Sequence, residues 1–305
     1  MKKAIVTGAN GFVGTWLIKE LISQGVQVIT VVRSTESDIK TLMQFENVRI
    51  VVCPLAEISN LPLLISDTDI DVFYHFAWTG VGGSSRSNYE MQLLNAKFAC
   101  DAAVVAKKLN CMKFLCAGTI TEKIAENVLN INVKAENMIY GVSKHTTHCI
   151  LDILCKNVGI DYVWMRLSNI YGPFNTTGNI ASYTLNEFRN GNTPTFSSGE
   201  QPYDLMYVED AAKAIYLLGQ CQTNENCYFI GSGTPKYLKD YLIEMCNIYG
   251  EGAQIALNKR PEDGLVYYKE WFDITPLHRD TGFMTDFTFK EGIIKTINWI
   301  KDLEG

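Results

Sequence analysis

The segment MIYGVSKH, residues 138–145, holds a tyrosine and a lysine four positions apart. Residues at i and i+4 share one face of a helix, so Tyr140 and Lys144 can reach the same site. A free tyrosine has a pKa near about 10, and a nearby positive charge lowers that pKa by favouring the phenolate. The pair can therefore be a proton donor and its activator. The same spacing also fits two residues on the exposed face of a helix.

A second pattern is the glycine-rich stretch VTGANGFVG, residues 6–14, which follows a strand-like run and opens a helical pattern. Glycines at such a turn let backbone N–H groups approach a pyrophosphate at the start of the helix. The predicted dinucleotide-binding residues here are Gly8, Asn10, Gly11, Phe12, Val13 and Gly14. The alternative is a glycine-rich turn that binds no ligand.

The second strand-like run ends in VVRST, and its tip carries Arg33 where an acid would read the adenosine ribose. An arginine at this place suits a 2′-phosphate, so NADP(H) is favoured and NAD(H) remains possible. The alternative is a solvated arginine at the end of a strand.

The elements that must position these residues alternate along the first half of the chain. Apolar runs at 3–7, 26–32, 48–52, 72–77, 113–117 and 161–167 are separated by helical patterns such as 12–24, 88–109 and 136–157. Continuous β-branched runs between helices predict parallel strands buried on both faces, in an α/β doubly wound sheet of Rossmann type. We expect a dinucleotide-binding domain from residues 1–169 and 204–230. A smaller, discontinuous substrate-binding lobe is expected from residues 170–203 and 231–305.

Composition excludes several classes of protein. The net charge is −6 with interspersed basic residues, so neither nucleic acid nor a membrane surface is an expected partner. Nine scattered cysteines, the lack of a signal-like N-terminus and the lack of a long apolar run favour the cytoplasm. His145 and His148 lie three residues apart, but no third ligand accompanies them, and no metal site is expected.

Six segments occur in a fixed order along the chain: TGANGFVG, YHFAW, FLCAGT, YGVSK, MRLSNIYGP and YDLMYVEDAAKAI. Together they resemble the extended short-chain dehydrogenase/reductase family, which includes nucleotide-sugar epimerases, dehydratases and ketoreductases. The resemblance implies a catalytic set of Thr119, Tyr140 and Lys144, in which Thr119 holds the substrate oxygen and Lys144 also bonds the nicotinamide ribose. It places Phe76, Ala77 and Trp78 beside the nicotinamide. With Thr119 and the glycine turn present, the catalytic interpretation of the Tyr–Lys pair is favoured.

The resemblance also implies a nucleotide-diphosphate sugar as substrate, with contacts from four residues. These are Asn169 and Asn179 for the sugar diphosphate, Phe196 beside the nucleobase and Arg260 as a pyrophosphate clamp. Loop asparagines often only cap turns, which is the alternative for both of them. The segment SSRSNYE (84–90) either borders the sugar pocket or caps a helix.

Some positions depart from the family pattern. Tyr203 stands where an arginine often contacts the diphosphate, and CPL (53–55) lacks an adenine-contacting aspartate. Ile120 and Thr121 occupy the two positions where dehydratases carry an acid–base pair, and Glu122 lies one position too far. Dehydration is therefore disfavoured.

The preferred function is NADPH-dependent reduction of a 4-keto, 6-deoxy nucleotide sugar. An NAD-dependent nucleotide-sugar 4-epimerase with the same catalytic residues is the alternative, and a non-catalytic dinucleotide sensor is a third. The resemblance implies a homodimer through the helices at about 88–109 and 136–157. Both helices carry apolar stripes that allow this pairing, but the same stripes could simply pack on the sheet.

Overall fold

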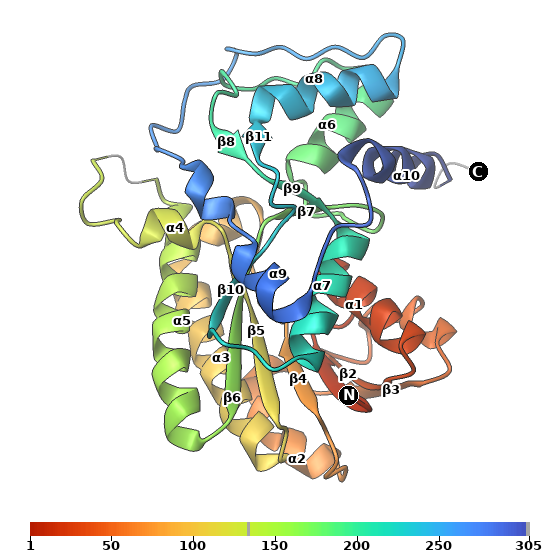
Figure 1. Ribbon diagram of the computed structural model, residues 1–305, viewed down its shortest axis with the longest axis vertical. Helices are drawn as coiled ribbons and strands as arrows, with labels where there is room; N and C mark the ends of the chain where they lie inside the picture. The colour runs from red at the N-terminus through yellow and green to blue at the C-terminus, as the bar shows by residue number, and fades with distance from the viewer. Residues whose placement is uncertain (133–134, 303–305) are drawn as a thin grey trace.

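A seven-stranded parallel sheet forms the centre of the protein in a computed structural model that describes residues 1–132 and 135–302 (Figure 1). The strands lie in the order β10-β6-β5-β4-β1-β2-β3, and every neighbouring pair is parallel. Their bounds are β1 Lys3–Thr7, β2 Gln27–Val32, β3 Val48–Val52, β4 Val72–His75, β5 Lys113–Thr119, β6 Asp161–Leu167 and β10 Cys227–Ile230. The order of the first six strands is that of a doubly wound dinucleotide-binding sheet, so the predicted fold class is confirmed.

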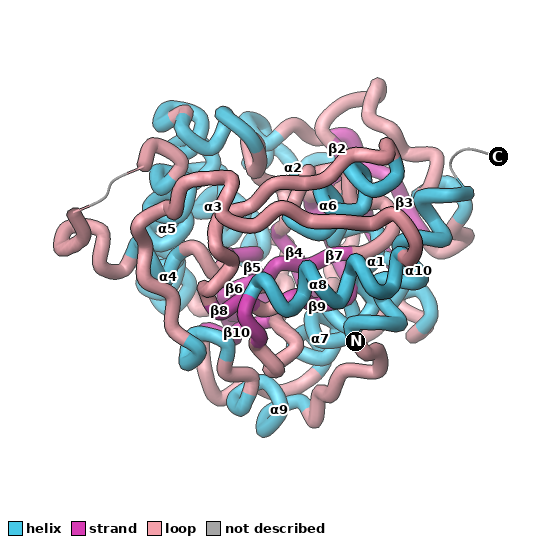
Figure 2. The backbone as a smooth tube through the Cα atoms, turned by 90° about the horizontal axis from the view of Figure 1, so that it is seen from above, coloured by secondary structure: helices cyan, strands magenta, loops and turns pink. Residues whose placement is uncertain are grey.

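Helices cover both faces of this sheet (Figures 1 and 2). One face packs against α1 (Phe12–Ser23) and α7 (Val208–Gln220), and the other packs against α3 (Tyr89–Lys108) and α5 (Met138–Val158). Successive side chains of a strand point to opposite faces, so Val6 packs on the first side while Ile5 packs on the second. Both faces are buried, which explains the unbroken apolar runs of the sequence.

The remaining elements lie mostly at the carboxyl ends of the strands. Two small sheets pair β7 (Asn169–Tyr171) with β9 (Leu205–Tyr207) and β8 (Pro202–Tyr203) with β11 (Lys236–Tyr237). The other helices are α2 Leu61–Leu64, α4 Glu122–Ala125, α6 Ile180–Arg189, α8 Leu238–Tyr249, α9 Thr275–Thr281 and α10 Phe289–Asp302. Short 3₁₀ turns are η1 Leu42–Gln44, η2 Leu55–Asn60, η3 Gly83–Ser87 and η4 Lys269–Phe272.

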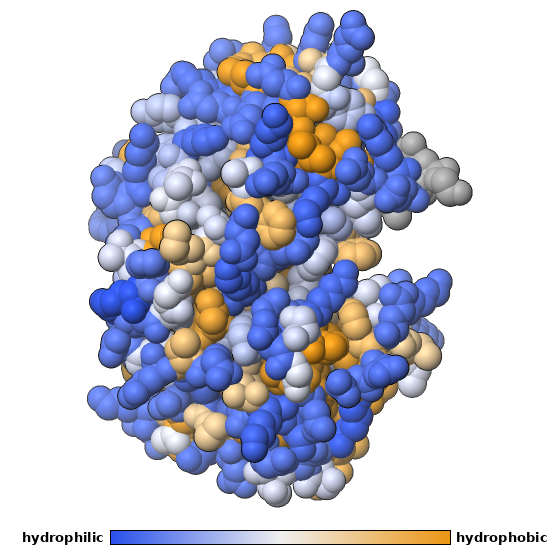
Figure 3. All heavy atoms as spheres, turned by 45° about the vertical axis from the view of Figure 1, so that its right-hand side comes forward, coloured by the Kyte–Doolittle hydropathy of each residue, from blue (hydrophilic) through white to orange (hydrophobic). Residues whose placement is uncertain are grey.

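Helices α6, α8 and α10 form the upper part of the molecule in Figure 1, above the sheet. One face of the molecule is mostly hydrophilic and is hollowed between its upper and lower parts (Figure 3). The predicted division into two lobes stays a prediction, and residues 133–134 and 303–305 of those lobes lie outside the described residues. Within the described part of the chain, no helix combines the length and apolar character that a membrane span requires.

Candidate active site

The turn between β1 and α1 has the geometry of a phosphate cradle. Gly8 has a φ of 67°, and a Cβ atom there would lie 2.7 Å from the backbone nitrogen of Ala77. A Cβ atom on Gly14 would lie 2.2 Å from the carbonyl oxygen of Gly8. Helix α1 starts at Phe12 without a side-chain cap on its first N–H groups. These free donors and the close backbone approach fit the pyrophosphate of a dinucleotide.

A cavity of about 480 Å³ opens beside this turn. Five predicted cofactor residues line it: Gly8, Asn10, Arg33, Ala77 and Trp78. The lining thus joins the ends of β1, β2 and β4, where an adenosine and a nicotinamide would lie in a doubly wound sheet. Glu36 and Asp38 line the same cavity as the exposed Arg33, so the end of β2 presents acids as well as a cation.

The Tyr–Lys pair is buried, which excludes the interpretation as an exposed helix face. Tyr140 is 8% exposed and Lys144 is 3% exposed, both on α5. The Lys144 ammonium donates a hydrogen bond of 2.6 Å to the carbonyl of Ala117 and lies 3.6 Å from the centre of the Trp78 ring. Burial lowers the pKa of Lys144 to about 8, although Cys116 and Glu122 oppose this shift. A pKa near 8 leaves most of this ammonium charged at neutral pH.

Burial shifts the pKa of Tyr140 upward, in the opposite direction to that of Lys144. Desolvation of the phenolate raises the pKa of Tyr140 to about 12, while the Arg86 guanidinium and the Thr119 hydroxyl lower it. Trp78 meets the Tyr140 ring edge-on at 6.4 Å, and the Trp78 indole donates to the Gln92 side chain at 2.8 Å. The loop predicted beside the nicotinamide is therefore fixed against the tyrosine.

Glu122 points away from the site and into the protein. Its buried carboxylate accepts hydrogen bonds from the Thr119 backbone N–H at 2.7 Å and from the Trp164 indole at 2.8 Å. It also accepts a hydrogen bond from Arg166 at 3.3 Å. Ile120 and Thr121, by contrast, line the neighbouring cavity. Glu122 thus fixes the end of β5. The cavity wall has no acidic side chain at position 120 or 121.

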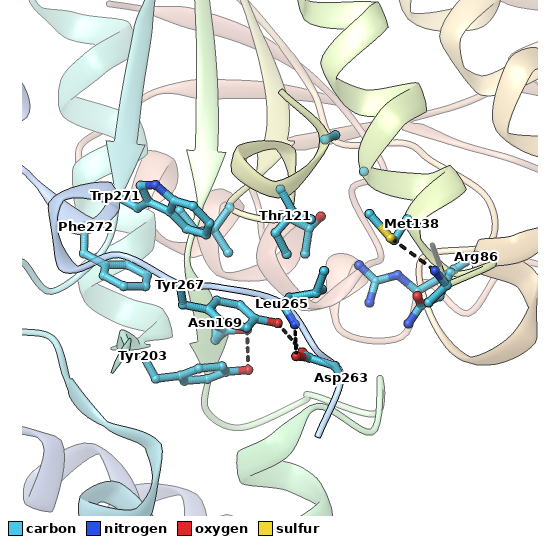
Figure 4. Close-up of a pocket in the computed structure, with 16 residues that line it drawn as sticks. Arg86, Thr121, Met138, Asn169, Tyr203, Asp263, Leu265, Tyr267, Trp271 and Phe272 are labelled. Atoms are coloured by element: carbon cyan, nitrogen blue, oxygen red, sulfur yellow. Dashed lines mark hydrogen bonds between the residues drawn. The ribbon is translucent and has the colours of Figure 1, made fainter. Parts of the chain in front are cut away.

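A second cavity, of about 270 Å³, is lined by sequence neighbours of the predicted catalytic residues, among them Thr121 and Gly141 (Figure 4). The predicted catalytic residues themselves are not part of its lining. Asn169, at the start of β7, lines it, and its Oδ1 accepts a hydrogen bond of 2.9 Å from the Tyr203 hydroxyl. The tyrosine that replaces the family arginine is therefore a partner of a predicted substrate residue. The loop before α9 supplies an aromatic and acidic wall of Asp263, Leu265, Tyr267, Trp271 and Phe272.

Asn179, Phe196 and Arg260 lie outside the described lining of this cavity. Asn179 caps α6: its Oδ1 accepts from the Ser182 N–H at 3.0 Å, and its Nδ2 donates to the Ile170 carbonyl at 2.7 Å. Phe196 is buried, and its carbonyl accepts from the backbone N–H groups of Lys259 and Arg260.

Arg260 has its polar atoms engaged at the protein surface. Its guanidinium donates to Thr195 Oγ1 at 3.0 Å and to the Tyr183 hydroxyl at 2.7 Å. The geometry therefore places Asn169 in the wall of the second cavity and gives the other three predicted substrate residues structural partners.

The cavity residues of the 263–272 loop are ones that the sequence did not single out, and Arg86 was named only as part of the segment 84–90. In that segment Asn88 caps α3 through the Met91 N–H at 3.0 Å, and Arg86 lines the cavity. That this cavity takes the sugar stays a prediction. Cavity-lining aromatic residues in a loop far along the chain have no spacing signature, so only the tertiary structure could reveal them.

The fold and site define a dinucleotide-binding α/β protein in which Tyr140 and Lys144 are buried and Thr119 is half-buried at the end of β5. The model of the NAD dependent epimerase/dehydratase family matches residues 4–231, and the chain belongs to that family. A putative UDP-glucose 4-epimerase of Methanocaldococcus jannaschii is 26% identical, with 98% of each chain covered. A dTDP-glucose 4,6-dehydratase of Streptomyces niveus is 23% identical over 98% of this chain and 93% of its own.

Among solved structures, a UDP-glucose 4-epimerase from Thermotoga maritima with UDP-glucose has a TM-score of 0.82 at 19% identity, covering 99% of this chain and 100% of its own. A UDP-N-acetylglucosamine 4-epimerase from Methanobrevibacter ruminantium has a TM-score of 0.80 at 21% identity, with 99% of each chain covered. At these identities the structures establish the shared fold alone. The chain is therefore an enzyme-family member whose particular reaction must be argued from its own site.

Proposed function

We propose that the protein is an NADPH-dependent reductase of a 4-keto, 6-deoxy nucleotide sugar. The observation that carries the proposal is the burial of Tyr140 and Lys144 beside a cavity whose wall has Ile120 and Thr121, and no acid, at the positions after Thr119. Proton transfer to an oxygen at Tyr140 is then possible, while an acid–base pair for elimination is missing from those two positions. Arg33 in the cofactor cavity supports the NADP(H) preference.

The bound dinucleotide would supply hydride to C4 of the sugar. Tyr140 would donate its phenolic proton to the C4 oxygen, so that hydride and proton together convert the ketone into an alcohol. The Thr119 hydroxyl would hold the same oxygen, and the Lys144 ammonium would stabilise the phenolate that remains. Asn169 would contact the sugar diphosphate from the second cavity.

The function is tested by a thermal-shift and turnover panel. NADPH and NADH are each combined with UDP-, dTDP-, CDP- and GDP-linked 4-keto sugars, and oxidation of the cofactor is followed. We expect turnover with NADPH and at least one sugar, and stabilisation by NADPH greater than by NADH. Stabilisation by NADH alone would contradict the role given to Arg33.

Tyr140→Phe is the matched catalytic variant, because it removes only the hydroxyl. We expect a loss of turnover of about 10²- to 10⁴-fold with cofactor binding retained, since general acid catalysis contributes that much. Cofactor binding is measured by thermal shift on the same samples. Unchanged turnover in this variant would exclude the mechanism.

An NAD-dependent 4-epimerase is the second candidate. Two observations favour it: relatives over the full chain include a putative UDP-glucose 4-epimerase, and Glu36 and Asp38 line the cofactor cavity where they would repel a 2′-phosphate. An epimerase returns the hydride to the sugar, so it would interconvert two nucleotide sugars without net consumption of cofactor. Co-purified NAD together with such interconversion would replace the reductase proposal.

We also propose a cytoplasmic homodimer. All nine cysteines are free, which suits a reducing compartment. The outer faces of α3 and α5 carry exposed apolar side chains, namely Tyr89, Leu93, Leu94, Ile150 and Ile153. Burying these faces against a second copy would form a bundle of four helices, as the family resemblance implies.

A further inference from the structure

Arg86 lies against the face of the catalytic tyrosine. Its guanidinium carbon is 4.4 Å from the centre of the Tyr140 ring, and it reaches this place from the short turn η3, before α3. The side chain also lines the cavity of about 270 Å³ together with Tyr203 and Tyr267 (Figure 4). Arg86 thus stands between the proposed proton donor and the space for the sugar.

The guanidinium has no anion to neutralise it among residues 1–132 and 135–302. Its Nε atom is buried without a hydrogen-bond partner, and the described residues place no carboxylate within ion-pair distance of it. Leaving a buried donor unpaired costs free energy, about 1–3 kcal/mol. The aromatic ring that the Arg86 guanidinium faces is that of Tyr140.

Lys144, the expected activator of Tyr140, is held by other groups. Its ammonium bonds the Ala117 carbonyl and packs on the Trp78 ring, and Trp78 also meets the Tyr140 ring edge-on. Burial raises the pKa of Tyr140 to about 12, and Arg86 is the foremost neighbour that lowers it. Of the two cations, Arg86 is therefore the one that contacts the face of the Tyr140 ring.

We propose that Arg86 is a positioning residue for proton transfer, whose charge against the ring face of Tyr140 makes the phenolate accessible during turnover. This inference rests on Tyr140 being the proton donor of the proposed function. A cation over an aromatic face is attracted to the ring and stabilises negative charge on it more strongly still. Arg86 and Lys144 would then act on the same hydroxyl from different elements.

Among the residues that the structure describes, few side chains shift the ionisation of Tyr140. Thr119 on β5 and Arg86 on η3 favour the phenolate, while Glu122 on α4 opposes it, and Lys144 lies on the same helix as Tyr140. Arg86 in turn faces Tyr203 and Tyr267, and it lowers the pKa of both phenols against the raising effect of their burial. Asp263 lines the same cavity, but its carboxylate is engaged by the Leu265 N–H and the Tyr267 hydroxyl.

The test is a spectroscopic titration of tyrosine ionisation in the full protein saturated with NAD⁺ or NADP⁺. The chain has 15 tyrosines, so the titration of the same variant carrying Tyr140→Phe is subtracted from each titration, which isolates the signal of Tyr140. We expect Arg86→Gln to move this ionisation to higher pH by about 1 to 3 pH units. Arg86→Lys keeps the charge and should move it by less than half as much.

Lys236→Gln is the matched control, because it removes a cation that lies 5.2 Å from the centre of another tyrosine ring, that of Tyr241. It should leave the Tyr140 ionisation unchanged. If Arg86→Gln does not melt cooperatively, Arg86→Met takes its place, since it keeps the aliphatic stem. The proposal would be overturned if the Tyr140 ionisation did not move in Arg86→Gln or its replacement Arg86→Met. It would also be overturned if Arg86→Lys shifted that ionisation as much as the neutral variant does.

The titration needs no sugar substrate, so its outcome is independent of the turnover panel. If a substrate is found, the pH dependence of kcat should move in the same direction in Arg86→Gln. A rise in KM with an unmoved pH profile would mean that Arg86 only binds substrate, and this result would also overturn the proposal.

Discussion

Two charged side chains, Lys144 and Glu122, are buried around the end of β5, and each has different partners. Lys144 keeps its charge by bonding the Ala117 carbonyl, and Glu122 is satisfied by Thr119, Trp164 and Arg166. Burial raises the pKa of Glu122 nonetheless, because its neighbours only partly offset the loss of water. The proposed catalytic residue Thr119 is thus joined through its backbone N–H to this network of charged side chains.

His148 extends this network and predicts a dependence of stability on pH. Its ring stacks on Trp164 at 5.1 Å with an interplanar angle of 2°. Burial first, and then the Arg166 charge, lower the pKa of His148 from 6.5 to about 4. The unfolded chain therefore binds this proton at a higher pH than the folded protein does, so stability is lost as pH falls from about 6.5 to about 4.

His148→Phe should reduce the loss of stability at low pH, because it keeps a ring stacked on Trp164 and removes the titrating group. We expect the two proteins to have similar stability at pH 7.5. At pH 4.5 the wild type should have lost about 1–3 kcal/mol more than the variant. His75 and Asp210 also have shifted pKa values, but both remain in the variant, so the difference isolates His148. Urea unfolding at both pH values measures it, and parallel losses would contradict the prediction.

At the scale of the elements, the residues of the candidate site lie at the carboxyl ends of the parallel strands. Gly8 follows β1, Arg33 follows β2, Trp78 follows β4 and Thr119 ends β5. A parallel sheet places all these ends at one edge, which is why motifs scattered along the sequence meet. The backbone geometry of the turn after β1 then determines whether a dinucleotide can approach the start of α1.

Gly14→Ala tests that turn. Its new Cβ atom would meet the Gly8 carbonyl at 2.2 Å, a backbone atom that cannot rotate away, so the turn must shift. We expect the affinity for NAD(H) and NADP(H) to fall at least tenfold, as measured by calorimetry.

Gly25→Ala is the control for a general loss of stability. Gly25 has a φ of 75° and open space around its Cβ position, so alanine strains the backbone without touching the phosphate cradle. It should lower stability by about 1–2 kcal/mol and leave cofactor affinity unchanged. Equal affinity losses in both variants would show that the glycine turn has no special part in binding.

At the scale of the whole molecule, the proposed dimer depends on a face that the fold leaves uncovered. Leu93 on α3 is 62% exposed and Ile153 on α5 is 64% exposed, although both helices pack on the sheet with their other sides. Each apolar side chain of this kind gains about 1.5–3 kcal/mol when it is fully buried. A second copy of the chain would cover both faces at once.

The double variant Leu93→Glu, Ile153→Glu should convert the dimer into a monomer of 34.3 kDa in analytical ultracentrifugation, because two charges per chain would enter an apolar interface. Leu63→Glu changes a residue that is 85% exposed on α2 and should leave the assembly unchanged. A monomeric wild type, or a double variant that stays dimeric, would exclude this interface.

The sequence by itself determined the sheet, its flanking helices, the glycine turn and the Tyr–Lys spacing. These features depend on local periodicity, on glycine geometry and on the helical repeat, all of which are written in neighbouring residues. The predicted ranges 3–7, 48–52 and 161–167 coincide with β1, β3 and β6. The return of residues 227–230 to the main sheet was also predictable, because their apolar run follows a helix.

Tertiary structure alone decided which side chains meet. Arg86 reaches Tyr140 from a different segment, Glu122 turns inward instead of into the cavity, and Asn179 caps a helix. Such outcomes depend on the direction of each side chain after the chain has crossed the sheet, and on the competition between partners that are distant in sequence. No spacing within one segment encodes that competition, so the electrostatics around Tyr140, the proposed proton donor, emerged only from the folded protein.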